Sequence, residues 1–220
     1  MAEQQIISKE RVANHGEVFT AEREVKAMCD LVKQETERID SRFLEPACGN
    51  GNFLAEILRR KLSVVRDRYG KSLYDYERYS VLAVTSLYGV DILKDNAQAC
   101  RDRLYQIWDE AYMTTIKKQA DEPCRNAVQF ILQKNILCGD ALTMRQTDGS
   151  PIVFAEWSLV TGSLIKRRDF ELAQLLDDCG QQPDMFASSW NDYEENVHPF
   201  IPSPIREYPL TDYRRVQDHE

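Results

Sequence analysis

The chain has 220 residues, of which 43% are hydrophobic, and it contains only nine glycines and eight prolines. This length suits one domain of about 150–200 residues with an extra segment, and the composition excludes a low-complexity linker. The net charge of −8 argues against a DNA-binding module that acts alone, because such modules neutralise phosphates with basic side chains. It does not exclude a DNA-acting subunit whose partner supplies the basic contacts.

Nothing in the sequence points to a membrane or to export. No run approaches the roughly 20 apolar residues that span a bilayer, and residues 1–10 are polar and lack an apolar signal core. The six cysteines form no C-x-x-C pair, so the spacing of zinc ligands is missing and no metal site is predicted. We expect free thiols in a cytoplasmic protein.

Helices and strands are predicted to alternate along most of the chain. A helix over residues 21–38 has apolar residues at helical spacing and Thr20 as its N-cap. The other expected helices cover residues 52–68, 74–85, 94–118, 122–133 and 164–176, and the expected strands cover 42–45, 87–92, 135–140 and 152–154. This alternation predicts an α/β fold with a parallel sheet and crossover helices.

The stretch LEPACGNGNFL, residues 44–54, combines a strand end, a carboxylate, a Gly-x-Gly turn and a helix start. Glycine lets a ligand approach the backbone of such a turn closely. Three successive predicted strands end in an acid, namely Glu45, Asp91 and Asp140. Because ligands bind beyond the carboxyl ends of parallel strands, we predict a nucleoside-bearing cofactor at this edge.

Two kinds of cofactor compete for the turn. A dinucleotide site requires a third glycine three residues after Gly51, where this chain has Leu54. The carboxylate of Glu45 would also repel a pyrophosphate. S-adenosylmethionine carries a cationic centre and an amino group, both of which tolerate that carboxylate, so the residues favour this cofactor.

These motifs resemble those of the DNA adenine N6-methyltransferases, which include type I modification subunits and related restriction–modification methylases. LEPACGNGNFL is similar to their first motif, and HGEVFT (15–20) is similar to the loop that precedes it. GVDI (89–92) and NILCGDAL (135–142) are similar to their second and third motifs. The resemblance covers about residues 11–142, with the motifs in the family's order.

The resemblance implies a role in cofactor binding for ten residues. They are Phe19 and Thr20 over the methionine moiety, Glu45, Ala47, Gly49 and Gly51 along the turn, Asp91 and Ile92 at the ribose and adenine, and Asp140 and Ala141 at the base. From the residues alone, Phe19 can equally be a staple onto the following helix. The alternative for Asp140 is that it ends its strand in a turn.

The family's catalytic motif, Asn/Asp-Pro-Pro-Tyr/Phe, binds and stacks on a flipped adenine. Residues 143–220 contain no Pro-Pro dipeptide, so no catalytic residue is identified, and no stretch is large enough for a target-recognition domain. Three explanations stay open. The chain can be part of a split enzyme, a relative that binds the cofactor without transferring methyl groups, or an enzyme with a site of another kind.

The resemblance implies a Rossmann-like methyltransferase fold with a truncated sheet, whose exposed edge favours a partner subunit or a homo-oligomer. The expected parts are a helical segment (1–40), the cofactor-binding domain (41–178) and an extended or disordered, proline-rich arm (179–220). The expected function is an S-adenosylmethionine-binding subunit that methylates DNA adenine in a restriction–modification or anti-phage system, with DNA bound through the complex. The alternative is a non-catalytic binding or regulatory protein.

Overall fold

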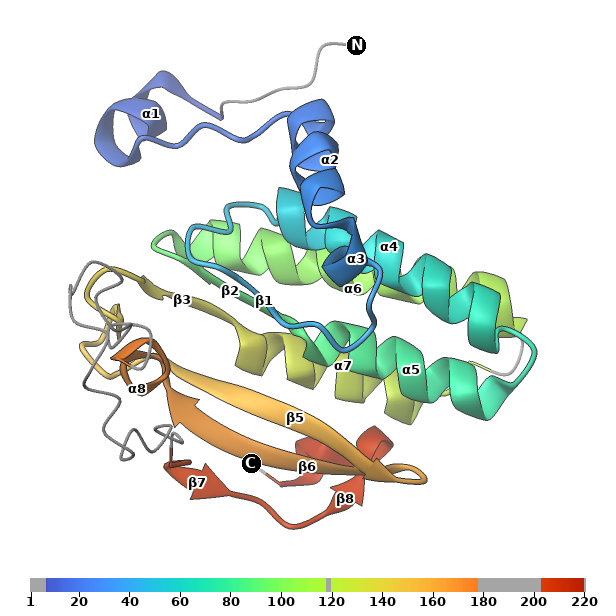
Figure 1. The fold of residues 1–220 in the computed structure, drawn as a ribbon. Helices are drawn as coiled ribbons and strands as arrows, with labels where there is room; N and C mark the ends of the chain where they lie inside the picture. Colours follow the sequence, from blue (N-terminus) through green and yellow to red (C-terminus); the bar gives the residue numbers. More distant parts are fainter. Residues whose placement is uncertain (1–6, 118–119, 178–202, 220) are drawn as a thin grey trace, which may run out of the picture.

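The protein has a mixed α/β fold, shown in Figure 1. The computed structural model describes residues 7–117, 120–177 and 203–219. These residues form two four-stranded sheets. Helices α4 and α6 cover the first sheet, and α5 and α7 lie against the second (Figure 1).

The first sheet has the strand order β1-β2-β3-β4. Its strands are β1 (Phe43–Glu45), β2 (Leu87–Asp91), β3 (Ile136–Asp140) and β4 (Arg145–Gln146). The first three strands are parallel, and β4 pairs antiparallel with β3. Each of the parallel strands ends on an acid, as the sequence predicted, and their common direction brings Glu45, Asp91 and Asp140 to one edge.

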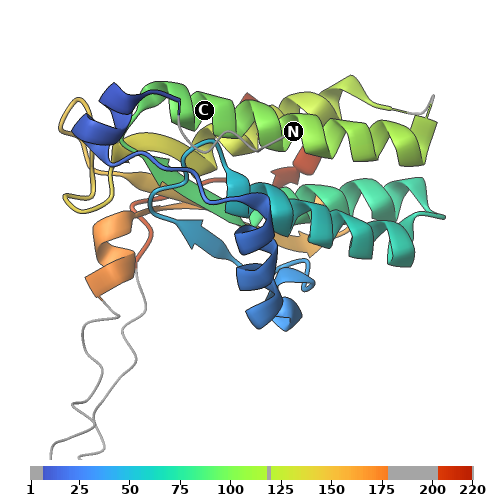
Figure 2. The ribbon, with the colours of Figure 1, turned by 90° about the horizontal axis from the view of Figure 1, so that it is seen from above.

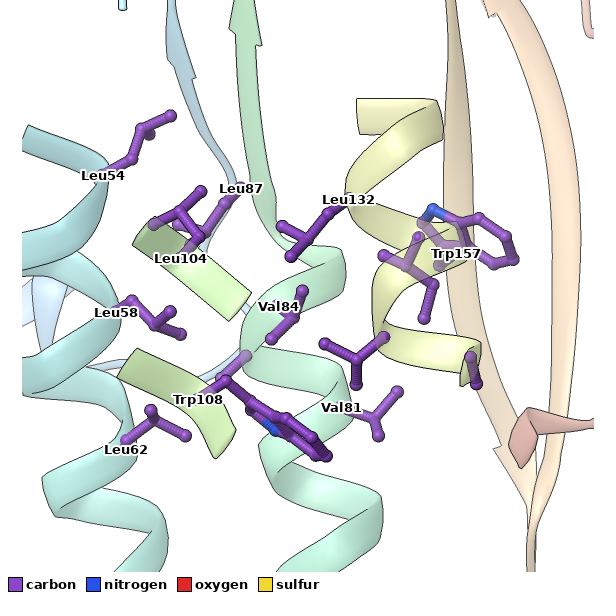
Figure 3. Packing of buried hydrophobic residues seen from close by; sticks show 14 of the residues in the cluster. Leu54, Leu58, Leu62, Val81, Val84, Leu87, Leu104, Trp108, Leu132 and Trp157 are labelled. Carbon is purple, nitrogen blue, oxygen red and sulfur yellow. The ribbon is translucent and has the colours of Figure 1, made fainter. Parts of the chain in front are cut away.

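The helices that pack around this sheet are α4 (Asn52–Tyr69), α5 (Leu73–Thr85), α6 (Lys94–Ile116) and α7 (Glu122–Asn135). Their bounds confirm the helices predicted in these regions to within about two residues. Leu54, Leu58 and Leu62 recur every four residues, which places them on one face of α4. Figure 3 shows this face against Leu104 and Trp108 of α6, all of them buried.

Asn135, at the end of α7, links the two sheets. Its side-chain amide donates to the carbonyls of Thr85 and Leu87 at 3.2 Å, on the side of the first sheet. Its side-chain oxygen accepts from Trp157 Nε1 at 3.0 Å, on the side of the second sheet. Buried polar groups without partners are costly, so these bonds fix how the two sheets meet.

The N-terminal part contains α1 (Lys9–His15), α2 (Glu22–Leu31) and α3 (Lys33–Thr36). The helix predicted over residues 21–38 is therefore interrupted, because Val32 has non-helical φ and ψ of −119° and 35°. The predicted N-cap was also wrong, since Ala21 occupies that position. Viewed from above in Figure 2, α1 lies beside the start of α6.

The second sheet contains β5 (Val153–Thr161), β6 (Leu164–Glu171), β7 (Arg206–Glu207) and β8 (Thr211–Asp212). The helix predicted over residues 164–176 is wrong for its first part, where β6 lies, and α8 (Leu172–Asp177) covers only its end. The reason is a hairpin that turns at Gly162, whose φ is 56°. Beyond this turn, Arg167 Nε donates to Asp169 Oδ1 at 2.8 Å. Side chains two residues apart lie on one face of a strand, whereas in a helix they point in different directions.

The C-terminal residues do not form the extended arm that the sequence predicted, at least over residues 203–219. They contain β7, β8 and the 3₁₀ segment η3 (Tyr213–Asp218). Tyr213 is fully buried in the main hydrophobic core, and its hydroxyl donates to Glu77 Oε2 at 3.0 Å. Tyr208 and Val216 are buried as well, and β7 and β8 pair with β6, so apolar burial and strand pairing together hold this segment. Residues 179–202 of the predicted arm lie outside the described residues. The predicted domain boundaries stay predictions.

Candidate functional site

A cavity of about 490 Å³ lies at the carboxyl ends of β1, β2 and β3. Its size falls in the range of about 300–1,000 Å³ that is typical of small-molecule sites. The lining comes from four separate parts of the chain: residues 16–19, residues 46, 47 and 49, residues 91–93 and 96, and residues 139–142. The parallel sheet is what brings these segments together, because its strands all end at this edge.

Seven of the ten residues predicted for the cofactor line this cavity: Phe19, Ala47, Gly49, Asp91, Ile92, Asp140 and Ala141. The other three lie outside its lining. Gly51 is the N-cap of α4, directly after the turn. The carbonyl of Thr20 accepts a hydrogen bond from Asn52 Nδ2 at 2.8 Å, which ties the loop before α2 to the start of α4. Glu45 lines a different, apolar pocket between β1, α2 and α4.

The two glycines of the turn are required by the backbone and by close neighbours. Gly49 and Gly51 have φ values of 52° and 83°, which side chains rarely allow. A Cβ on Gly49 would lie 3.0 Å from the ring of Phe19, and one on Gly51 would lie 2.7 Å from Cys100 Sγ. Phe19 therefore packs on the turn from the cavity side, and Cys100 packs on it from the core.

Asp91 connects the turn to the end of β2. Its Oδ2 accepts from the Gly49 N–H at 2.8 Å, and its Oδ1 accepts from the Leu93 N–H at 2.8 Å. Asn96 Nδ2 also donates to Oδ1, at 3.2 Å. The residue is buried, with 7% of its surface exposed. Because a carboxylate has about four lone-pair sites, it retains the capacity to accept from a hydroxyl in the cavity.

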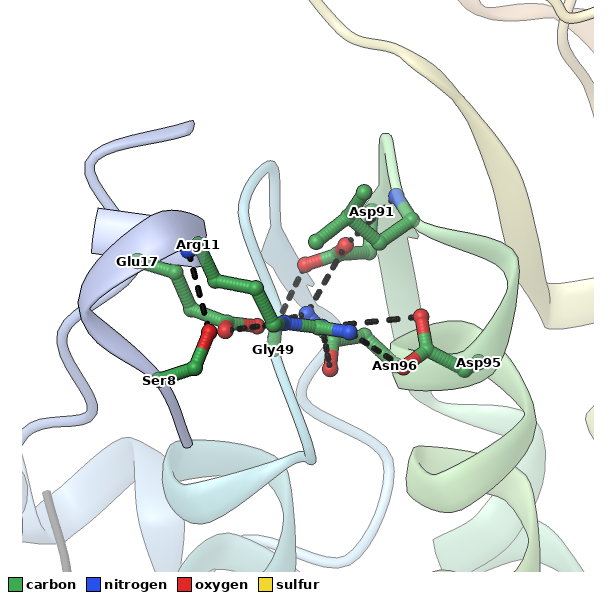
Figure 4. Close-up of polar contacts among 8 residues, drawn as sticks. Ser8, Arg11, Glu17, Gly49, Asp91, Asp95 and Asn96 are labelled. Atoms are coloured by element: carbon green, nitrogen blue, oxygen red, sulfur yellow. Dashed lines mark hydrogen bonds and ion pairs between the residues drawn. The ribbon is translucent and has the colours of Figure 1, made fainter. Parts of the chain in front are cut away.

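Sequence reasoning missed a group of polar residues beside Asp91, shown in Figure 4. Asn96 Nδ2 donates to Glu17 Oε1 at 2.7 Å, and Arg11 Nη2 donates to the same oxygen at 2.7 Å. Arg11 also pairs with Asp95 at the start of α6. Glu17 lies within the HGEVFT motif, which could have identified it. Arg11 and Asn96 are 85 positions apart, and no local pattern signals their contact.

The charges in this lining are acidic. Glu17, Asp91 and Asp140 contribute carboxylates, and none of the described residues that line the cavity is a lysine or arginine. The hydrogen bond from Arg11 holds the pKa of Glu17 below its ordinary value, and the bond from Asn96 acts in the same direction. Glu17 is thus a carboxylate at neutral pH and forms an ion pair with Arg11, so Asp91 and Asp140 are the lining acids without an arginine partner among the described residues.

Asp140 ends its strand in a turn, as one of the two interpretations from the sequence predicted, while its contact with the base stays a prediction. It lines the cavity, and its Oδ1 also accepts from the Leu142 N–H at 2.9 Å, which closes a turn at the end of β3. Leu142 is 92% exposed at the mouth of the cavity. One carboxylate oxygen thus shapes the turn, and the group as a whole still faces the cavity.

Part of this chain is similar to a type I restriction enzyme methylase subunit (MjaVII) from Methanocaldococcus jannaschii. The two are 37% identical over 83 residues, which cover 34% of this chain and 13% of that relative. Part of this chain is therefore related to a restriction–modification methylase subunit. The match spans only a small fraction of the relative's length. No family model matches the chain, and no solved structure matches it.

Two further properties constrain the site. Among residues 7–117, 120–177 and 203–219, no group of histidine, cysteine or carboxylate side chains could hold a metal ion. In the same residues, no helix is both long and apolar enough to cross a membrane. The cavity with its acidic lining is therefore the feature on which a function is argued.

Proposed function

We propose that this chain is the S-adenosylmethionine-binding subunit of a cytoplasmic DNA adenine N6-methyltransferase in a restriction–modification or anti-phage system. Residues 41–178 would form a Rossmann-like methyltransferase unit with a truncated sheet. A second polypeptide would supply the catalytic motif and contribute to DNA binding. Methyl transfer in such an enzyme relies chiefly on the positioning of the two reactants.

The observation that carries this proposal is the pairing of a glycine turn, with positive φ at two positions, with an acidic cavity at one sheet edge. The turn has two glycines with positive φ, and the ring of Phe19 packs on Gly49 from the cavity side. The lining holds Glu17, Asp91 and Asp140 without a basic residue in the part of the chain described. A dinucleotide would bring a negative pyrophosphate into this lining, whereas S-adenosylmethionine brings a sulfonium and an ammonium group.

The residues present fit this cofactor in three respects. Asp91 has unused acceptor capacity for the ribose hydroxyls, and Ile92 beside it offers an apolar surface for the adenine. Phe19 lies against Gly49 and would cover the methionine end. Glu17, held by Arg11 and Asn96, would offer its remaining acceptor capacity to the ammonium group. The similarity to a methylase subunit supports the same assignment.

A calorimetric titration of the full chain with S-adenosylmethionine tests cofactor binding, with NAD⁺ as the matched comparison. We expect heat of binding for the first ligand and none for the second, because NAD⁺ would bring a negative pyrophosphate into the acidic lining, whereas S-adenosylmethionine has a net positive charge. The absence of heat for S-adenosylmethionine, or equal binding of NAD⁺, would overturn the assignment.

Transfer of a labelled methyl group to mixed-sequence DNA tests the need for a partner. We expect no transfer by the chain alone, since residues 143–220 contain no Pro-Pro dipeptide. Transfer by the chain alone would show that it has a complete catalytic site. Binding without transfer in the presence of every partner that it copurifies with would favour the non-catalytic alternative.

A further inference from the structure

Residues 8–20 form one wall of the cavity. The segment consists of α1, its N-cap Ser8 and the loop that leads to α2, and it contributes Glu17 and Phe19 to the cavity lining. Figure 1 shows α1 on the side of the molecule at which β1, β2 and β3 end. We call this segment the N-terminal strap.

Apolar packing does not attach the strap to the core. Neither hydrophobic cluster of the described residues contains a residue of the strap, and Val18 is 58% exposed. The backbone hydrogen bonds of the described strap residues run within α1 and its two caps. Phe19 lies against Gly49, and the carbonyl of Thr20 accepts from Asn52 at the start of α4. The end that carries α1 therefore depends on polar side chains for its attachment.

Arg11 provides that attachment from within α1. Its Nε and Nη2 donate to the two carboxylate oxygens of Glu17, at 2.5 and 2.7 Å. Its Nη1 donates to Asp95 Oδ2 at 2.5 Å, and its Nη2 donates to Asn96 Oδ1 at 3.1 Å. Asp95 and Asn96 belong to the first turn of α6. One guanidinium group thus joins α1 and the following loop to α6 (Figure 4).

The contacts of Arg11 continue to the residues that shape the cavity. Asn96 Nδ2 donates to Glu17 Oε1 at 2.7 Å and to Asp91 Oδ1 at 3.2 Å. Asp91 in turn accepts from the Gly49 N–H. The position of the strap is therefore coupled to the end of β2 and to the glycine turn.

The contacts of Arg11 divide into an internal pair and an external pair. Arg11 and Glu17 both belong to the strap, so their ion pair stays intact when the strap moves as a unit. Both acids that Arg11 contacts are carboxylates at neutral pH, because its hydrogen bonds hold the pKa of Glu17 and that of Asp95 below their ordinary values. The Asp95 side chain is 63% exposed, and exposed ion pairs contribute little to stability. Opening therefore breaks the weaker contacts, those with the first turn of α6.

We propose that the N-terminal strap is a lid of the cavity and that Arg11 is the latch that holds this lid to α6. With the latch closed, Glu17 and Phe19 are held against the ligand. When Arg11 releases Asp95 and Asn96, the strap moves away from the cavity and the ligand enters or leaves. This inference rests on the proposed function, because the ligand is S-adenosylmethionine. It makes Arg11 a positioning residue that acts through Glu17.

Hydrogen exchange of the free full chain, followed by mass spectrometry, tests the latch without a ligand. Amide exchange reports local opening, so we expect Arg11→Met to speed exchange in residues 9–19 at least about tenfold and to leave α4 and α7 as in the wild type. An unchanged strap would overturn the latch. An equal increase throughout the chain would also overturn it, because Arg11 would then support the fold as a whole.

Arg23→Met is the matched control for this change. Arg23 lies in α2, shortly after the strap, and its side chain is 90% exposed and pairs with Glu24 at 3.2 Å. The variant removes the same type of side chain without touching the latch. We expect exchange in the strap to equal that of the wild type. The same increase as in Arg11→Met would mean that the strap responds to any loss of positive charge nearby, and would contradict the latch.

The release of tritium-labelled S-adenosylmethionine into an excess of unlabelled cofactor tests the lid. Because affinity changes at one site lie mostly in dissociation, we expect Arg11→Met to raise the dissociation rate constant at least about tenfold and to change the association rate constant less than about threefold. Arg11→Lys should raise dissociation less, since lysine keeps the charge but lacks the planar fork that bonds Glu17 and Asp95 together. An unchanged dissociation rate constant for Arg11→Met would overturn the lid.

The two measurements separate this inference from the function on which it rests. Absence of S-adenosylmethionine binding by the wild type would overturn the proposed function, while hydrogen exchange still decides whether Arg11 latches the strap. Binding with unchanged dissociation in Arg11→Met would overturn the lid and leave the proposed function. If Arg11→Met fails to fold, as judged by circular dichroism, Asp95→Asn takes its place, because it weakens the latch at an exposed side chain. Exchange and dissociation should then rise in the same direction, and no rise in either would overturn the proposal.

Discussion

Asp91 and Gly49 are joined by a hydrogen bond of 2.8 Å from the Gly49 N–H to Asp91 Oδ2. The bond runs from the turn after β1 to the last residue of β2, the neighbouring strand. A second bond of 2.8 Å, from the Leu93 N–H to Oδ1, fixes the other carboxylate oxygen. One buried acid thus sets the shape of the turn and the wall of the cavity together.

Asp91→Asn should damage both the turn and cofactor binding. The amide has one oxygen and one NH₂ group, so one of the two backbone donors at Asp91 loses its acceptor. We expect S-adenosylmethionine to bind at least about tenfold more weakly, equivalent to about 1.4 kcal/mol. We also expect the free energy of unfolding to fall by about 1–3 kcal/mol. Calorimetry and urea denaturation measure the two effects.

The control for this change is Asp67→Asn, because the Asp67 side chain is 67% exposed on α4. Substitutions on such surfaces usually change stability by less than about 0.5 kcal/mol. Similar losses in the two variants would mean that Asp91 does not organise the turn.

Gly51→Ala and Gly149→Ala form a matched pair at the same backbone conformation. Their φ values are 83° and 84°, so alanine meets comparable backbone strain at both positions. The space around them differs, since a Cβ on Gly51 would lie 2.7 Å from Cys100 Sγ and one on Gly149 meets nothing within 4 Å. We expect Gly149→Ala to cost about 1–2 kcal/mol and Gly51→Ala to cost more.

Urea denaturation of both glycine variants gives the difference directly. The excess cost of Gly51→Ala reports overpacking against Cys100, a buried thiol of α6 that has little room to move. If both variants lose the same stability, the turn is not held tightly against α6 in solution.

The central part of the fold could be predicted because its signals are local. The helices α4 to α7 bury continuous apolar faces, and β1, β2 and β3 follow from short apolar runs that end in acids. The Gly-x-Gly turn carries its own evidence, because positive φ at two positions requires glycine. Most of the predicted residues that line the cavity belong to motifs at the ends of β1, β2 and β3, where the local sequence signal is strong.

The parts that were missed depend on contacts between distant segments. Arg167 and Asp169 fall in the stretch that was predicted to be a helix, and their burial depends on their mutual pairing and on Tyr208, which follows β7 and lies 39 positions after Asp169. Tyr213 lies in a proline-rich, charged stretch, and its core position depends on Glu77, 136 positions earlier. Arg11 joins the site through Asp95 and Asn96, which no local pattern predicts.

Tyr213→Ala tests whether the C-terminal segment belongs to the core. Tyr213 is fully buried and its hydroxyl donates to Glu77 Oε2 at 3.0 Å. Removal of a buried aromatic ring typically costs about 3–5 kcal/mol. We expect a loss of that order in urea denaturation, against a small loss for Tyr74→Ala, whose side chain is 41% exposed. Equal effects would restore the view of residues 203–219 as a loose arm.

Lys61 should make the stability of the protein depend on pH in the alkaline range. Its side chain is fully buried, with Nζ donating to Ser86 Oγ at 2.5 Å and to the Ser41 carbonyl. Burial lowers the pKa of Lys61 to about 7, from an ordinary value of 10.5. Between these two values the unfolded chain holds a proton at Lys61 that the folded protein lacks. Unfolding therefore takes up a proton, and stability rises with pH across this window.

Lys61→Met removes this dependence, so its stability relative to wild type should be highest near pH 7 and should decrease as the pH rises toward about 10. Below about pH 7 Lys61 is protonated in both the folded and the unfolded wild type, so the difference in free energy of unfolding between Lys61→Met and the wild type should become constant. Urea denaturation of both proteins at a series of pH values measures this difference, and the contributions of the other titrating groups cancel in it. Lys71→Met, at an exposed position, should give a difference that does not vary with pH. A flat difference for Lys61→Met as well would show that Lys61 keeps its ordinary pKa in the folded protein.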